Sequence, residues 1–125
     1  RPGVAGVIGS ITERSVVGRF LEHSRVYWFR NGGDDEVLLG SADLMPRNLN
    51  HRVEVIFPVL DAGIRARIRD DILPLYLADN QKTRVLDAAG SWTHIWPEDG
   101  EEPLNAQERF VPRARESAVD ESDRA

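Results

Sequence analysis

The sequence predicts an α/β fold in which a mixed β-sheet is flanked by helices. Short segments rich in β-branched and aromatic residues are separated from longer segments whose apolar residues recur at helical spacing. The composition of the 125 residues, 41% hydrophobic and 30% charged, is typical of a folded globular protein. Helices packed on a sheet are an arrangement that buries both kinds of segment.

The chain is expected to begin with a loop and a helix. Residues 1–9 contain three glycines and one proline, a composition typical of loops. Residues 10–13 have the spacing of a capping box. Apolar residues at helical spacing follow and predict a helix over residues 11–22: Val16, Val17, Phe20 and Leu21.

A β-hairpin and a third strand are expected next. Residues 25–30 are aromatic and β-branched and predict a strand, and residues 36–41 predict the returning strand. Residues 31–35 between them begin with Asn-Gly, a strong signal for a hairpin turn. A loop is expected over residues 42–50, because a proline there interrupts any sheet ladder. Residues 52–59 predict the third strand.

A long helix and a small hairpin are expected in the second half of the chain. Asp61 is placed to cap a helix over residues 62–77, whose apolar residues recur at helical spacing. Pro74 should kink or end this helix, because proline lacks the N–H that an interior helical position donates. Residues 83–87 and 91–95 predict two short paired strands.

Residues 1–97 are expected to form one domain, and residues 98–125 an acidic, flexible extension. The extension holds nine acidic and four basic residues, so its net charge of −5 equals that of the whole chain. With few large apolar residues, it is expected to form at most a short helix around residues 105–110. Because the sequence opens with Arg-Pro-Gly rather than methionine, we expect a fragment of a longer chain.

Composition and charge exclude several classes of protein. The chain contains no cysteine, which excludes disulfides, thiolate metal sites and a cysteine nucleophile. No basic field favours nucleic acid, no apolar run predicts a transmembrane segment, and nothing resembles a signal peptide. We therefore expect a cytoplasmic protein, with peripheral membrane association left open. Lys82 is the only lysine, and the arginine bias suits phosphate recognition, although a GC-rich genome produces the same bias.

His23 is the histidine best placed for chemistry. It lies between the expected helix and the first strand, at the edge of the sheet, where α/β proteins often place their sites. His51 and His94 are better explained as surface or packing residues. Position alone leaves an ordinary structural role open for His23 as well.

The hairpin is expected to bring a second group of polar residues to His23. If the two strands pair through the Asn-Gly turn, Ser41 and Asp43 lie near the His23 end of the first strand. A histidine, a hydroxyl, an acid and backbone N–H groups after a glycine favour an oxyanion or phosphate site. Arg47 and Arg52 flank the next loop and are candidates for phosphate contacts, although each is also explained as a solvated charge.

Long motif strings around these residues resemble a known enzyme family. They match the last catalytic domain of bacterial polyphosphate kinase, the phosphohistidine-forming type: Ser15–Tyr27, Asn31–Gly33, Gly40–Leu49 and Arg52–Val55. Arg1–Val4 resembles the loop that leads into this domain, and Tyr76–Asn80 resembles the end of its late helix. The resemblance covers about residues 1–95.

The resemblance implies a phospholipase D-like fold and a role in phosphoryl transfer. Enzymes of this family reversibly transfer the terminal phosphate of ATP to polyphosphate through a phosphohistidine formed in the preceding domain. His23 matches the second histidine of the site, which contacts nucleotide phosphates and is a candidate catalytic residue, as a proton donor or a stabiliser of the transition state. By the same resemblance, Ser41, Asp43, Arg47 and Arg52 join His23 in phosphate or ATP binding.

Cofactors and partners follow from the same resemblance. The complete enzyme is expected to use Mg²⁺ and ATP, to bind ADP and polyphosphate, to contain upstream domains and to form a homo-oligomer. The fragment itself is expected to need no cofactor, to hold no metal and to be inactive alone. The alternative is a non-catalytic domain that packs against neighbouring domains or subunits.

Three positions depart from phospholipase D itself. That superfamily has lysine two residues after histidine and aspartate five residues further on, where this chain has Arg25 and Arg30. It also has asparagine where this chain has Asp43. A lipase or nuclease activity is therefore disfavoured.

Overall fold

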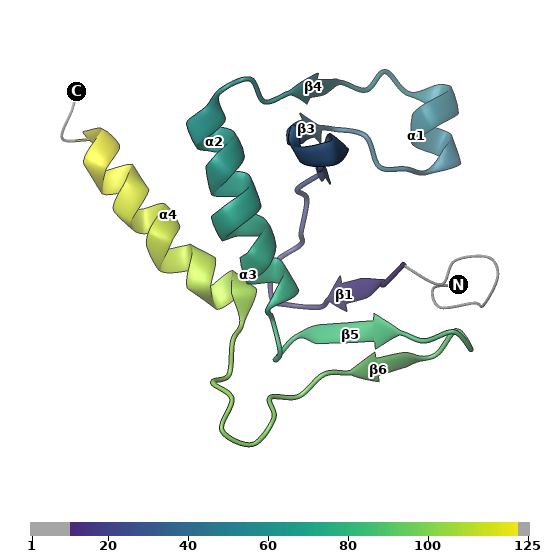
Figure 1. Cartoon of the computed structure of the whole chain (residues 1–125), viewed down its shortest axis with the longest axis vertical. Helices are drawn as coiled ribbons and strands as arrows, with labels where there is room; N and C mark the ends of the chain where they lie inside the picture. Colours follow the sequence, from purple (N-terminus) through teal and green to yellow (C-terminus); the bar gives the residue numbers. More distant parts are fainter. Residues whose placement is uncertain (1–10, 123–125) are drawn as a thin grey trace. The chain divides into compact units, whose positions relative to one another are not determined.

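The computed structural model describes residues 11–122, with the side chains of Leu49 and of residues 115–122 left aside (Figure 1). The expected loop over residues 1–9 lies outside these residues. The chain combines helices with two three-stranded sheets. One has the order β1 (Arg14–Val16), β5 (Thr83–Leu86) and β6 (Trp92–His94), and the other has the order β2 (Val26–Phe29), β3 (Glu36–Gly40) and β4 (Ile56–Pro58). It divides into two compact parts, Glu22–Pro74 and the segments around it in sequence.

The α/β class is confirmed, but the expected mixed sheet is wrong. Every strand pair in the described part of the chain is antiparallel. Tight turns explain the pairing of β2 with β3 and of β5 with β6, because a parallel pair needs a crossover of a dozen or more residues. The other two pairs join strands that lie farther apart in the sequence.

The predicted central hairpin is confirmed. Strands β2 (Val26–Phe29) and β3 (Glu36–Gly40) pair with Trp28 opposite Val37. The turn between them contains the 3₁₀ segment η1 (Asn31–Gly33), whose three residues all have positive φ. Asparagine and glycine are the residues that adopt this conformation at least cost, which explains the Asn-Gly-Gly sequence.

The segment after the hairpin differs from its prediction. Residues 42–50 were expected to be a loop, but helix α1 (Pro46–His51) forms there. Proline occupies the first helical turn, where its missing N–H has no intrahelical partner and its fixed φ suits the helix. The expected strand over residues 52–59 is shorter, since β4 covers only Ile56–Pro58 and pairs with β3.

The predicted long helix is present and continues past Pro74. It runs through α2 (Ala62–Arg67), the π-helical turn η2 (Ile68–Ile72) and α3 (Leu73–Leu77). The Asp61 carboxylate accepts a hydrogen bond from the Ile64 N–H at 2.8 Å, which confirms the predicted cap. The π-helical turn lies directly before Pro74. It already interrupts the regular helical hydrogen-bond pattern at the point where proline lacks an N–H to donate.

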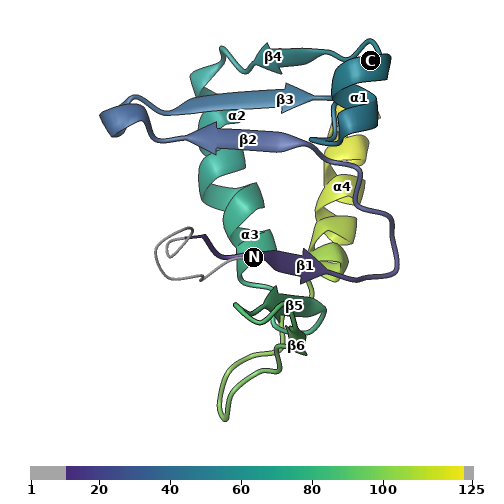
Figure 2. The same cartoon turned by 90° about the vertical axis from the view of Figure 1, so that its right-hand side faces the viewer.

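The core of Glu22–Pro74 lies between the helix and one face of the sheet (Figure 2). Val37, Val59 and Ile68 are buried there, and Val26, Leu39, Ile72 and Leu73 pack around them. On the opposite face, Phe29 and Ile56 are each 47% exposed. Among the described residues of Glu22–Pro74, a helix therefore packs on one face of this sheet.

The other part of the chain contains the second sheet. Strand β1 (Arg14–Val16) pairs with β5 (Thr83–Leu86), which pairs with β6 (Trp92–His94), so the predicted terminal hairpin is confirmed. The helix predicted over residues 11–22 is wrong. Residues 14–16 pair with β5 instead, and three of the four residues of the expected apolar face are exposed, with Leu21 at 84%.

The acidic extension contains a longer helix than expected. Helix α4 (Ala106–Ser122) follows Asn105, whose side chain accepts a hydrogen bond from the Glu108 N–H at 3.4 Å. Its start is anchored by Asp79, whose Oδ2 accepts from the Ala106 N–H at 2.8 Å. The expectation of at most a short helix near residues 105–110 is therefore wrong, while the domain boundary at residue 97 stays a prediction.

No helix in the described range has the length and apolarity needed to cross a membrane.

Candidate functional site

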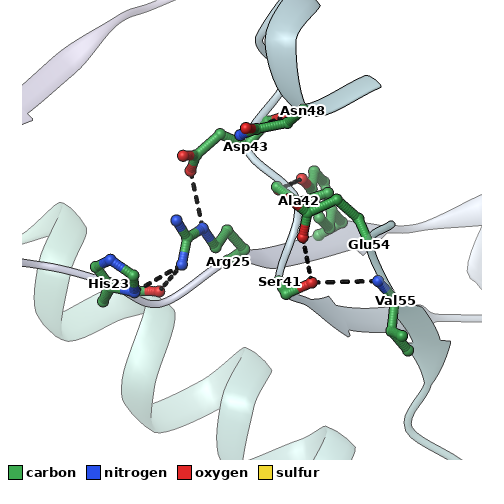
Figure 3. A network of polar contacts seen from close by, with 9 residues as sticks. His23, Arg25, Ser41, Ala42, Asp43, Asn48, Glu54 and Val55 are labelled. Atoms are coloured by element: carbon green, nitrogen blue, oxygen red, sulfur yellow. Dashed lines mark hydrogen bonds and ion pairs between the residues drawn. The ribbon is translucent and has the colours of Figure 1, made fainter. Parts of the chain in front are cut away.

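The central hairpin brings the His23 loop and the segment after β3 to the same end of the sheet. The β2–β3 register places Arg25 beside Gly40, whose N–H donates to the Arg25 carbonyl at 3.3 Å. Ser41, Ala42 and Asp43 follow directly. Figure 3 shows these residues together with His23 at one edge of the sheet. The proximity predicted from the hairpin is therefore present.

Arg25 links His23 to Asp43. Its Nε donates to Asp43 Oδ1 at 2.8 Å, and the two side chains are 18% and 36% exposed. Its Nη1 lies 2.8 Å from His23 Nδ1 and donates to the His23 carbonyl oxygen at 2.9 Å (Figure 3). His23 itself is exposed. The histidine is thus held from one side and open to solvent on the other.

The Arg25–Asp43 pair is electrostatically complementary. The hydrogen bond from Arg25 holds the pKa of the Asp43 carboxyl below its usual value of 3.8. The same hydrogen bond raises the pKa of Arg25. Because the pKa of Asp43 is lowered in the folded protein, the pair stabilises the protein fully at pH values above the usual aspartate pKa. This stabilisation is lost as the pH falls through the lowered pKa of the folded protein. At neutral pH both groups are charged.

Hydrogen bonds behind Asp43 fix the loop that carries it. Its carbonyl accepts from the Met45 N–H at 2.8 Å and from Asn48 Nδ2 at 3.5 Å. Asn48 is 3% exposed, and its Oδ1 has no hydrogen-bond partner among the described residues. The Tyr27 hydroxyl donates to the Ala42 carbonyl at 3.0 Å. The loop after β3 is therefore tied to both β2 and α1.

Ser41 bonds to the segment before β4 rather than to His23. Its hydroxyl donates to Glu54 and accepts from the Val55 N–H at 3.2 Å (Figure 3). Its own N–H donates to the Val55 carbonyl at 2.9 Å. Gly40 permits this close approach, since a Cβ at that position would lie 2.7 Å from the Val55 carbonyl oxygen. The hydroxyl proton of Ser41 is therefore already donated within the protein.

The two flanking arginines are open to solvent. Arg47 on α1 and Arg52 just after it are exposed, and neither forms an ion pair with another residue of the described segments. His51 is exposed on the same helix. His94 belongs to the other part of the chain, where its ring lies 4.1 Å from that of Trp96. This contact agrees with the packing role expected for His94.

Sequence reasoning missed the residues that connect the site. Arg25 was noted only as a departure from phospholipase D, although the hairpin register that predicts Ser41 near His23 also places Arg25 between them. Glu54 and Asn48 gave no signal of their own. Their partners lie 13 and five residues away in sequence, across turns whose geometry the sequence pattern does not specify.

The residues present do not form a magnesium site. Within the described range, no three histidine or acidic side chains gather closely enough to hold a metal ion. Near His23, Asp43 is paired with Arg25 and Glu54 is bonded to Ser41. Magnesium is bound through carboxylates and other oxygen ligands, and both of these carboxylates already have partners within the protein.

Comparison with known proteins identifies the family. The family model described as polyphosphate kinase C-terminal domain 2 matches residues 1–107. The chain belongs to the polyphosphate kinase family. The matched range contains the whole of the His23–Arg25–Asp43 network and both flanking arginines.

Several relatives of this family are closely similar. The chain is 48% identical over 113 residues to polyphosphate kinase 1 of Chlorobaculum tepidum, covering 90% of this chain and 16% of the relative. The same values hold for a polyphosphate kinase of Pseudomonas aeruginosa. The crystal structure of polyphosphate kinase from Porphyromonas gingivalis matches with a TM-score of 0.72 and 39% identity, covering 83% of this chain and 16% of that one. The chain therefore spans about a sixth of the length of these relatives.

Proposed function

We propose that this chain contributes the second half-site of a polyphosphate kinase. In the complete enzyme, the terminal phosphate of ATP passes to a histidine nitrogen outside this chain and releases ADP. The phosphate then passes from that histidine to the terminal oxygen of polyphosphate, and both steps are reversible. The observation that supports a role for this chain is the exposed His23, which a fixed arginine holds beside Asp43. The exposed Arg47 and Arg52 follow Asp43 in the chain, on α1 and directly after it. The fold we propose for the complete domain is phospholipase D-like.

Each site residue has a proposed role in that reaction. His23 donates a hydrogen bond to an oxygen of the transferring phosphoryl group, whose charge must be stabilised during transfer. Arg47 and Arg52 supply charge-assisted contacts to phosphate oxygens. Asp43 acts by holding Arg25 in place. Ser41 helps to shape the site through the hydrogen bonds of its hydroxyl and its backbone N–H. Mg²⁺ would be held by residues outside this chain, where it would offset the negative charge of the nucleotide phosphates.

A role limited to assembly is the alternative. Exposed apolar side chains on the β2–β3–β4 sheet agree with contacts to a neighbouring domain, but such contacts are expected of a catalytic domain as well. Nothing in the comparisons favours the alternative. A homo-oligomeric complete enzyme in the cytoplasm, with peripheral membrane association left open, stays a prediction.

Substitution of the flanking arginines tests whether this edge binds phosphate. In the complete enzyme, Arg47→Gln and Arg52→Gln are each expected to raise the KM for ATP or polyphosphate about tenfold or more, because each removes a charge-assisted hydrogen bond. Arg30→Gln is the matched control, since Arg30 is exposed at the opposite end of β2. Steady-state kinetics at several salt concentrations measures the effect.

Two results would contradict the proposal. One is an unchanged KM for both substrates in the doubly substituted enzyme. The other is a KM that changes equally in the Arg30 control, which would indicate a general loss of positive charge rather than a local site. If the double substitution instead weakens subunit or domain association and leaves turnover intact, the assembly role is favoured.

A further inference from the structure

The contact between Arg25 and His23 determines which ring nitrogen carries the proton. A guanidinium group has five N–H donors and no acceptor, and it stays charged at any pH at which the protein is folded. Arg25 Nη1 lies 2.8 Å from His23 Nδ1, within hydrogen-bond distance. Nδ1 must therefore be the acceptor, because two facing N–H groups would repel. In a neutral imidazole with Nδ1 unprotonated, the proton is on Nε2.

Arg25 is itself fixed, so the contact is built into the fold. The residue immediately precedes β2, and its backbone carbonyl accepts from the Gly40 N–H. The Nε group is bonded to Asp43, and Nη1 also donates to the His23 carbonyl at 2.9 Å. The carbonyl contact orients the backbone of His23 while the Nδ1 contact orients its ring. Asp43 is anchored in turn by Met45 and the buried Asn48.

We infer that Arg25, held by Asp43, is a positioning residue that fixes His23 as a neutral hydrogen-bond donor with its proton on Nε2. This inference rests on the proposed function and deepens it. It gives a physical reason why the second histidine does not take the phosphoryl group. Nδ1 is occupied by Arg25, and Nε2 carries a hydrogen rather than a lone pair. The ring can therefore stabilise charge on a phosphoryl oxygen, while the nucleophile must come from elsewhere.

The tautomer is measured by nitrogen NMR. The complete enzyme is labelled with ¹⁵N at the histidine ring nitrogens and studied by magic-angle-spinning NMR at neutral pH. The His23 signals are assigned from the difference between the wild type and His23→Gln. We expect an unprotonated Nδ1 and a protonated Nε2. In Arg25→Met, which has a side chain of similar reach but no donor, the Nδ1 signal is expected to move as the two tautomers mix.

Kinetics separate a positioning role from direct substrate binding. Arg25→Met is expected to lower kcat about 10- to 100-fold, the equivalent of one lost charge-assisted hydrogen bond, and to leave the KM for ATP within about threefold. Asp43→Asn is expected to lower kcat less, because asparagine still offers an oxygen to Nε. Arg25→Lys is expected to recover part of the loss, since an ammonium can still donate to Nδ1. Arg30→Met is the matched control and should leave kcat unchanged.

Two outcomes overturn the inference while the proposed function stands. The first is a His23 ring with Nδ1 protonated in the wild type, in an enzyme that still requires His23 for activity. The second is an Arg25→Met enzyme whose KM for ATP rises while kcat is kept, which would make Arg25 a substrate ligand. Failure of the proposed function itself has a different signature, because His23 would then be dispensable for turnover.

Discussion

His23→Ala in the complete enzyme is expected to lower the rate of polyphosphate synthesis about 100- to 1,000-fold. This is the cost of removing one preorganised hydrogen-bond donor from a site where charge develops during the reaction. The ring is exposed, and among the described residues its hydrogen bond is to Arg25, so protein stability should hardly change. The rate of polyphosphate formation from ATP and the thermal unfolding midpoint measure the two effects.

His51→Ala is the matched control for this prediction. His51 is an exposed histidine on α1, and it is not among the residues to which we assign a role. Its substitution should leave turnover within about twofold, as expected for a surface position. Near-normal turnover of the His23→Ala enzyme, with weaker association of domains or subunits, would instead favour the assembly role.

Asp79→Ala is expected to destabilise the protein more than any substitution at the candidate site. The carboxylate is 1% exposed and accepts hydrogen bonds from the N–H groups of Lys82 and Ala106 at 2.7 and 2.8 Å. It also accepts from the Gln81 N–H at 3.1 Å and from the Thr83 hydroxyl at 3.3 Å. Alanine would leave two buried and two partly buried donors without this partner. We expect a loss of about 3 kcal/mol or more in the free energy of unfolding.

Urea denaturation measures this loss, with Asp87→Ala as the matched control. Asp87 is exposed and its side chain accepts a single hydrogen bond, from the Ser91 N–H at 2.8 Å, so its loss should cost about 1 kcal/mol or less. Asp79→Asn should be intermediate, because one amide oxygen is kept but an N–H₂ group replaces an acceptor. Equal destabilisation by Asp79→Ala and Asp87→Ala would show that the buried network does not anchor α4.

The elements that local sequence chemistry determines were predicted well. The Asn-Gly turn, the strands around it and the Asp61 cap depend on residues close together in the chain. The segment around Ser15 and Val16 was predicted incorrectly, because its β-branched residues pair with β5, which is far away in sequence. Helix α4 was underestimated for a similar reason. Its first turn is held by Asp79 and not by apolar periodicity.

The sequence predicted which residues of the candidate site lie near one another, but not the hydrogen bonds between them. Strand pairing was enough to place Asp43 near His23, since a hairpin returns its second strand to the start of the first. Pattern alone could not show that Arg25 lies between the two, or that Ser41 turns toward Glu54. These hydrogen-bond partners depend on side-chain rotamers and on competition among several neighbouring polar groups.

The location of the phosphoryl group in the phosphorylated enzyme tests the central claim most directly. The complete enzyme is incubated with ATP labelled in its terminal phosphate, digested under alkaline conditions that preserve phosphohistidine, and its labelled peptides are sequenced by mass spectrometry. We predict label on a histidine outside this chain and none on His23. Stable label on His23 would show that this ring is a nucleophile and would contradict the division of roles proposed for the two halves of the site.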